Sequence, residues 1–173
     1  MSVCLLATSV IFLGGCERKE KKLTIEYVYP PNPPTQPDSI PTGAVIVFMR
    51  NGNLHTDRNY IYPKNCDLPF FINKSDNFQG ESNTANDGWK FAVIGEVEGL
   101  WKITEKPADN STAWATEVAV KPGYGYVGQC DNENSNVRAY VAIYVARLVK
   151  DADTGGIIGA EVRYYSPFPT ANR

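Results

Sequence analysis

From residue 43 onward, patterns of apolar and polar side chains with a period of two, the spacing of β-strands, outnumber patterns with the period of a helix. The longest such stretch covers residues 137–149, where aliphatic side chains occupy the odd positions from 137 to 145. Residues 158–164 alternate in the same way after a polar, glycine-ended turn. Together the two stretches predict the strongest hairpin of the chain. A helix over residues 139–148 is the alternative.

Shorter stretches predict further strands at residues 43–49, 89–97, 101–103, 114–120 and 124–127. Residues 43–49 are apolar on both faces, as expected of a central strand. Residues 114–120 and 124–127 flank Pro122-Gly123, a pair that suits the centre of a type II turn, so we expect them to form a hairpin. Several short strands with regular turns predict an all-β fold, an antiparallel sandwich or barrel-like single domain.

The N-terminus has the pattern of an export signal. Residues 3–13 are predominantly apolar and too short to cross a bilayer as a helix, but they have the length of the apolar region of a signal peptide. Leu13-Gly14-Gly15-Cys16 follows, and then a charged run. These four residues resemble the lipobox of bacterial lipoproteins. The resemblance implies a signal peptide over residues 1–15, cleavage before Cys16 and lipidation of Cys16, which would anchor the protein to a membrane without spanning it.

A charged and proline-rich segment separates Cys16 from the predicted domain. Residues 16–41 contain a possible strand at 23–29 and then half of the prolines of the chain, a density that favours an extended spacer. We therefore expect a tether over 16–41 and the β domain over 42–173, with residues 23–29 as either an added edge strand of the domain or part of the tether. Within the tether, Asp38-Ser39-Ile40 resembles the acceptor motif for O-linked glycans in Bacteroidetes, with a plain polar linker as the alternative.

The cysteines and the charge limit the possible chemistry. If residues 1–15 are removed and Cys16 carries lipid, Cys66 and Cys130 remain, and in an exported protein they are candidates for one disulfide or for two separate thiols. With a single histidine in the chain, they are a poor basis for a zinc site. Seventeen basic and nineteen acidic residues give a net charge of −2, which does not favour nucleic acid as a partner.

No catalytic motif stands out. His55 lies close to the Asn51-Gly52 turn without a nearby nucleophile, and we expect it to be a solvent-facing loop residue. The loop at residues 131–136 carries oxygen ligands at alternate positions but lacks the glycine and distal glutamate of a calcium loop, so we expect a polar loop and no bound metal or cofactor. A glycosidase needs only two carboxylates. The candidates are Asp87, Glu96, Glu98, Glu117, Asp131 and Glu161.

Aromatic residues are abundant, with three tryptophans and ten tyrosines. Flat aromatic side chains with polar edges suit the apolar faces of sugar rings. Candidates for such a stacking surface are Trp101, Trp114, Tyr124 and Tyr126. The alternative is that these side chains fill and border a β core.

A series of short motifs carries a family resemblance. The motifs are Phe70-Phe71-Ile72, Gly88-Trp89-Lys90-Phe91, Val118-Ala119-Val120, Pro122-Gly123-Tyr124-Gly125-Tyr126, Gly155-Gly156-Ile157-Ile158 and Ser166-Pro167-Phe168. As a series they resemble a family of small Bacteroidetes lipoproteins of unknown function. The resemblance implies an envelope lipoprotein, and it supplies no catalytic residue, cofactor or substrate.

The pattern as a whole predicts a cell-envelope lipoprotein, anchored in the outer membrane and facing either the periplasm or the outside. We expect a non-catalytic module that binds a glycan or another envelope protein. A small carboxylate-dependent hydrolase and a structural accessory subunit of an envelope complex are the alternatives.

Overall fold

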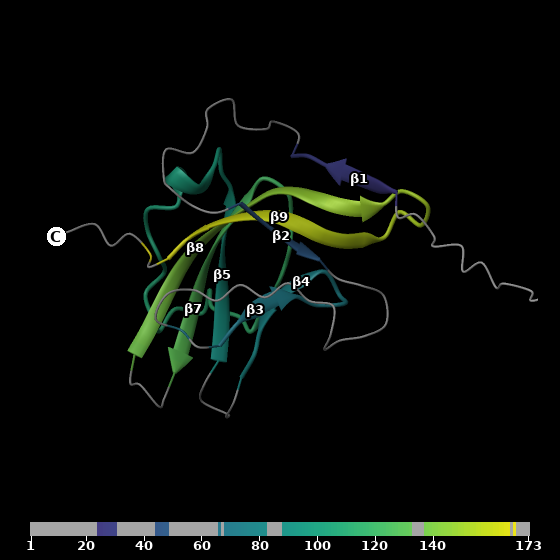
Figure 1. Ribbon diagram of the computed structural model, residues 1–173. Helices are drawn as coiled ribbons and strands as arrows, with labels where there is room; N and C mark the ends of the chain where they lie inside the picture. Colours follow the sequence, from purple (N-terminus) through teal and green to yellow (C-terminus); the bar gives the residue numbers. More distant parts are fainter. Residues whose placement is uncertain are drawn as a thin grey trace, which may run out of the picture.

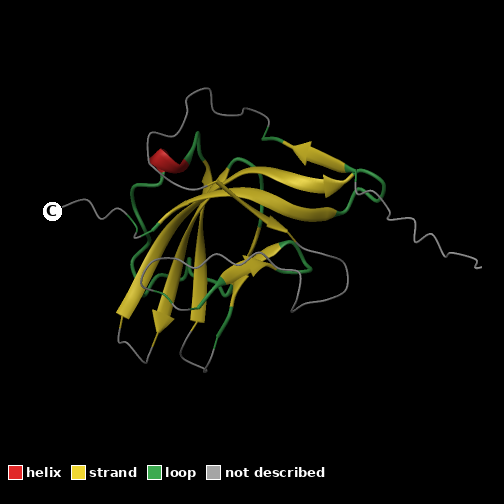
Figure 2. Ribbon diagram, in the orientation of Figure 1, coloured by secondary structure: helices red, strands yellow, loops and turns green. Residues whose placement is uncertain are grey.

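The computed structural model describes residues 24–30, 44–48, 66, 68–82, 88–132, 137–166 and 168. These residues form two antiparallel β-sheets, and the all-β prediction is confirmed (Figures 1 and 2). In this part of the chain the helical structure is a single short turn, η1 (Leu100–Lys102). No helix in the described ranges is both long and apolar enough to cross a membrane.

The larger sheet has six strands. Its order is β2-β9-β8-β7-β5, and β1 also pairs with β8. The bounds are β1 (Ile25–Val28), β2 (Ala44–Phe48), β5 (Gly88–Glu96), β7 (Tyr124–Asn132), β8 (Val137–Asp151) and β9 (Ile157–Tyr165). The predicted β8–β9 hairpin is confirmed, and the helical alternative for residues 139–148 is wrong because this stretch is the middle of a long strand. The first half of β8 pairs with β7, and its last four residues pair with β1.

The smaller sheet has the order β3-β4-β6, with β3 (Phe70–Ile72), β4 (Asn77–Gly80) and β6 (Glu117–Ala119). The hairpin predicted from residues 114–120 and 124–127 is wrong, because β6 pairs with β4 in this sheet and β7 belongs to the other one. The turn itself forms: the amide of Tyr124 donates to the carbonyl of Lys121 at 3.3 Å, and Gly123 has the positive φ of 80° that a type II turn requires. This turn therefore links the two sheets.

Two further predictions are corrected. The strand expected at residues 101–103 is absent, because the chain there forms η1 and buries Leu100 and Ile103. Strand β2 lies at the edge of the large sheet, although an apolar pattern on both faces suggested a central strand. Apolar side chains on both faces of a strand indicate that both faces are covered. They do not indicate how many neighbouring strands are hydrogen-bonded to it.

The core lies between the two sheets. Its aromatic centre consists of rings whose centroids lie 5.0–5.9 Å apart, from Phe70, Phe78, Trp89, Phe91 and Tyr126. We call this side of the large sheet the inner face. A second buried cluster covers the outer face, where η1 and Phe168 pack on Val127, Ala142 and Tyr144.

Cys66 and Cys130 form the predicted disulfide, with their Cα atoms 6.4 Å apart. The bridge joins the segment before β3 to the last part of β7 in the large sheet. It therefore fastens the two layers together on the inner face.

Strand β1 belongs to the large sheet, where it pairs with the end of β8. Of the two interpretations of residues 23–29, an added strand or part of the tether, the structure has the added strand. Residues 31–43 therefore join two strands of the same sheet along the chain. The described part of the fold begins at residue 24.

Candidate functional site

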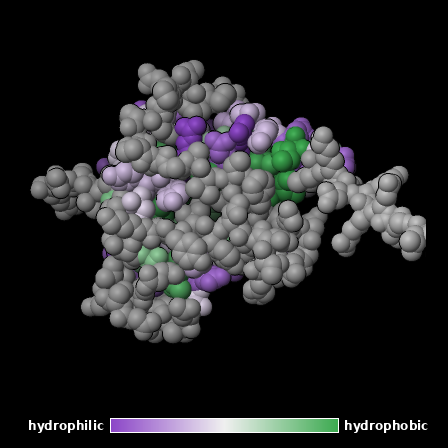
Figure 3. Space-filling model, viewed as in Figure 1, coloured by the Kyte–Doolittle hydropathy of each residue, from purple (hydrophilic) through white to green (hydrophobic). Residues whose placement is uncertain are grey.

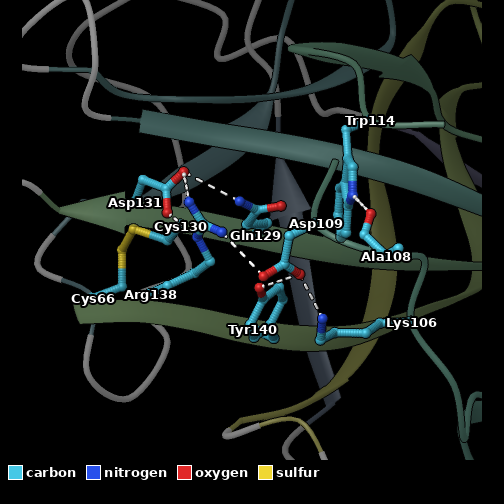
Figure 4. A network of polar contacts seen from close by, with 10 residues as sticks. All are labelled: Cys66, Lys106, Ala108, Asp109, Trp114, Gln129, Cys130, Asp131, Arg138 and Tyr140. Carbon is cyan, nitrogen blue, oxygen red and sulfur yellow. Dashed lines mark hydrogen bonds and ion pairs between the residues drawn. A yellow bond between two sulfur atoms is a disulfide. The ribbon is translucent and has the colours of Figure 1, made fainter. Parts of the chain in front are cut away.

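The outer face of the large sheet carries a polar network at the start of β8 (Figure 4). Arg138 and Tyr140 occupy alternate positions of β8 and therefore project from the same face. Asp131 on β7 is the direct cross-strand partner of Arg138. Lys106 and Asp109 come from the loop between η1 and β6. We call these five residues together with Trp114 the outer-face site.

Asp109 lies at the centre of the network. Its Oδ1 accepts hydrogen bonds from Lys106 Nζ and from the Tyr140 hydroxyl, both at 2.6 Å, and its Oδ2 accepts one from Arg138 Nη1 at 3.0 Å. These donors lower the pKa of Asp109 to about 2, and the hydrogen bond from Lys106 contributes most. Asp109 is therefore a carboxylate at any physiological pH.

The pKa values of the three groups that donate hydrogen bonds to Asp109 are all raised. The pKa of Lys106 is raised, mainly by its hydrogen bond to Asp109. The pKa of Tyr140 is raised first by burial and then by the hydrogen bond that it donates to Asp109. The pKa of Arg138 is raised, mainly by Asp131. The network thus holds fixed charges across a wide range of pH.

Arg138 connects this centre to the sheet. Its Nε and Nη2 donate to the two carboxylate oxygens of Asp131 at 2.5 and 3.3 Å, a forked arrangement that fixes the plane of the guanidinium. Gln129, which is only 2% exposed, donates its amide Nε2 to Asp131 at 3.1 Å. Its Oε1 has no hydrogen-bond partner among the described residues. Asp131 fixes this amide orientation, because a flip would turn Oε1 toward the carboxylate.

An aromatic pair borders the network. The indole N–H of Trp114 donates to the carbonyl of Ala108 at 2.9 Å, which fixes the ring on its own loop. The ring centroid lies 6.3 Å from that of Tyr140, and the two planes are inclined by 43°. Lys106 Nζ lies 4.3 Å from the centre of the Tyr140 ring. Trp114 and Tyr140 are both partly exposed, so ring surface and charged groups reach solvent side by side.

An open pocket of ≈ 430 Å³ adjoins the site at Lys106. Its other lining residues are Ile94, Lys102, Ile103, Thr104, Glu105 and Pro107. The pocket is therefore walled mainly by the same loop that supplies Lys106 and Asp109. A ligand bound at the aromatic pair has room to extend along this loop.

The four aromatic candidates from the sequence do not form one surface. Tyr126 is fully buried: its hydroxyl donates to the carbonyl of Ala119 and accepts from the amide of Lys121. Burial raises its pKa, and the side chain is a core residue that cannot stack on a ligand. Tyr124 packs against the inner core, and the ring of Trp101 lies over Gly99. Trp114 is the one candidate that the structure places in the outer-face site.

Sequence reasoning missed three of the four charged members of the site, Lys106, Asp109 and Arg138, and named Asp131 only as a candidate hydrolytic carboxylate and as part of a polar loop. Asp131 and Arg138 flank a short connection between strands, and such a spacing makes a cross-strand pair predictable once the hairpin is recognised. The remaining residues carried no comparable signal, because the loop that holds Lys106 and Asp109 has no periodicity.

The other sequence candidates fall outside this site. Cys16, Ser39, His55 and Asp87 lie outside the described residues, as do residues 133–136 of the polar loop. Of the carboxylates considered for hydrolysis, Asp131 and Glu161 each form an ion pair with an arginine. Within the described ranges, no group of three or more His, Cys, Asp or Glu residues is arranged to hold a metal ion.

No protein family, curated protein sequence or solved structure matches the chain.

Proposed function

We propose that the protein is a lipid-anchored envelope protein that binds a glycan at the outer-face site without catalysing a reaction. The observation that supports this most is the pairing of partly exposed aromatic rings, Trp114 and Tyr140, with charged groups that hold one another in place. The adjoining pocket supplies space for a chain of sugar rings.

The chemistry of the site suits a neutral sugar. Aromatic faces cover the apolar C–H face of a sugar ring, while carboxylate and guanidinium groups pair with its hydroxyls. Asp109 and Arg138 are 43% and 44% exposed, so a ligand can reach both. Two cations and two anions balance the charge of the site, which favours a neutral glycan over a polyanion. Because the network is already ordered, ligand binding costs little side-chain entropy.

The same network does not suit acid catalysis. A general acid at neutral pH needs a raised carboxyl pKa, whereas the pKa of Asp109 is held at about 2. The carboxylate can accept hydrogen bonds from sugar hydroxyls, and it has no proton to donate. This supports binding rather than hydrolysis.

Placement in the envelope rests on the sequence. The lipobox resemblance at Leu13-Gly14-Gly15-Cys16 and the resemblance of residues 70–168 to small Bacteroidetes lipoproteins both support anchoring in the outer membrane. A disulfide between Cys66 and Cys130 is in keeping with an oxidising compartment outside the cytoplasm. Mass spectrometry of the mature N-terminus tests this part directly, and an unmodified Cys16 in a retained leader would contradict it.

A glycan array probed with the purified protein tests the binding site, followed by calorimetry with any sugar that binds. We expect Trp114→Ala to weaken binding by at least about tenfold, equivalent to about 1.4 kcal/mol. Tyr140→Phe and Tyr124→Phe form a matched pair, since each removes one phenolic hydroxyl, the first on the outer face and the second on the inner face. Only Tyr140→Phe is expected to weaken binding. Binding to no sugar, or equal effects of the two Phe variants, would refute the proposed site.

A further inference from the structure

Strand β1 and the residue after it present a stripe of large side chains to solvent. Ile25, Tyr27 and Tyr29 occupy alternate positions and are 40%, 40% and 54% exposed. They make up three of the five large apolar side chains exposed in the part of the chain that the structure describes. In Figure 3, apolar side chains gather at the upper right, where Figure 1 places β1 and the end of the β8–β9 hairpin. Exposed apolar clusters of this kind mark contact surfaces.

Arg147 of β8 holds the tyrosines of the stripe in place. It lies across the stripe, with Cζ 3.9 Å from the centre of the Tyr27 ring and 5.4 Å from that of Tyr29. Its Nη1 donates to the Tyr29 hydroxyl at 2.5 Å, and its Nε donates to Glu161 at 2.7 Å. The two tyrosines are therefore fixed facing outward.

Chain length places this stripe close to the predicted anchor. Seven residues separate Cys16 from Thr24, where the described fold begins, and even fully extended they reach only about 27 Å. The proline-rich residues 31–43 come after β1 and add nothing to this tether. Of all the described elements, β1 is the one that the chain holds nearest to residue 16.

We infer that the β1 stripe rests on the bilayer surface; this inference relies on the lipidated Cys16 of the proposed function. Tyrosine is enriched at membrane–water interfaces because its ring is apolar and its hydroxyl is polar, and isoleucine favours the adjoining acyl region. Neighbouring charges are balanced, since Glu26 faces Lys150 across β1 and β8, and Arg147 pairs with Glu161. The surface therefore fits zwitterionic headgroups and does not depend on anionic lipid.

The experiment uses the acylated mature protein in vesicles of phosphatidylethanolamine and phosphatidylcholine that contain doxyl-labelled phosphatidylcholine as a quencher. Single cysteines at Ile25→Cys and Tyr27→Cys carry a nitrobenzoxadiazole fluorophore, because the native cysteines are acylated or disulfide-bonded. Val93→Cys is the matched control. It is 48% exposed, and it shares the inner-face parity of Trp89 and Phe91 on β5. Circular dichroism establishes that each variant is folded. The variant at Ile25 keeps both of the tyrosine rings that Arg147 contacts.

We expect doxyl lipid to quench the fluorophore at positions 25 and 27 at least twice as strongly as at position 93. Equal quenching at the three positions, or none, would overturn the inference. Flotation of the unlabelled protein with vesicles is measured first. If the protein floats but shows no selective quenching, the lipid anchor of the proposed function stands and only the contact of β1 with the bilayer is refuted. If the protein does not float, both the anchor and the contact are refuted. Glycan binding is measured separately and does not depend on either result.

Discussion

Replacing Asp109 by asparagine removes one charge from the centre of the outer-face site while nearly preserving its shape. In the wild type, the lowering of the Asp109 pKa from 3.8 to about 2 corresponds to at most about 2.4 kcal/mol. Because the side chain is 43% exposed, solvent screening reduces this, and we expect Asp109→Asn to cost about 1 kcal/mol at pH 7. Urea unfolding followed by circular dichroism measures this difference.

The pH dependence of that difference gives a sharper test. A carboxyl whose pKa is lowered on folding stabilises the protein above its unfolded pKa, and this stabilisation is lost as pH falls through the folded pKa. For Asp109 the window runs from about pH 4 down to about pH 2. The gap between wild type and Asp109→Asn should therefore be constant above pH 5 and shrink below pH 4. Glu98→Gln is the control: its carboxylate is 73% exposed and lies 3.5 Å from Lys102, so it should change stability by less than about 0.5 kcal/mol. A gap of the same size at pH 7 and pH 2 would refute the electrostatic account of the site.

Two other predictions test the packing of the two sheets. A Cβ at Gly80 would lie 2.1 Å from the ring of Trp89, so Gly80→Ala should destabilise the fold by about 1–3 kcal/mol in thermal or urea unfolding. Gly156→Ala is its control, because the nearest atom would be 3.5 Å away, and equal effects would mean that Trp89 does not sit against Gly80. The Cys66–Cys130 disulfide closes a separation of 64 residues, so Cys66→Ser with Cys130→Ser should lower the free energy of unfolding by about 4 kcal/mol. An unchanged urea midpoint of unfolding for the double variant would contradict a disulfide that links the two sheets.

The parts of the fold that could be predicted from sequence are those in which one local pattern determines the outcome. The β8–β9 hairpin follows from alternation on both sides of a polar turn. The type II turn at Pro122-Gly123 follows from residue types alone. The partner of a strand has no such local cause: β6 joins β4, forty residues away along the chain, because Phe78 and Val118 both pack on the inner core.

The site was predictable to a smaller extent. Trp114 was identified as an aromatic with a polar edge, but nothing in the sequence separates it from Tyr126, whose neighbours bury it completely. Asp109 gains its role only because the loop brings it over Arg138 and Tyr140, at sequence separations of 29 and 31 residues. Such contacts depend on the path of an irregular loop, and no periodicity encodes that path.

The proposed site and the proposed bilayer contact use opposite ends of one strand. Tyr140 belongs to the outer-face site, and Leu148 is the cross-strand partner of Val28 in β1. Eight residues at about 3.3 Å each separate these positions by about 26 Å along β8. If β1 rests on the membrane, the lipid surface and a bound glycan therefore occupy separate parts of the same sheet. A short tether then gives an advantage that a long flexible stalk lacks, because the orientation of the binding site relative to the bilayer is set by the sheet itself.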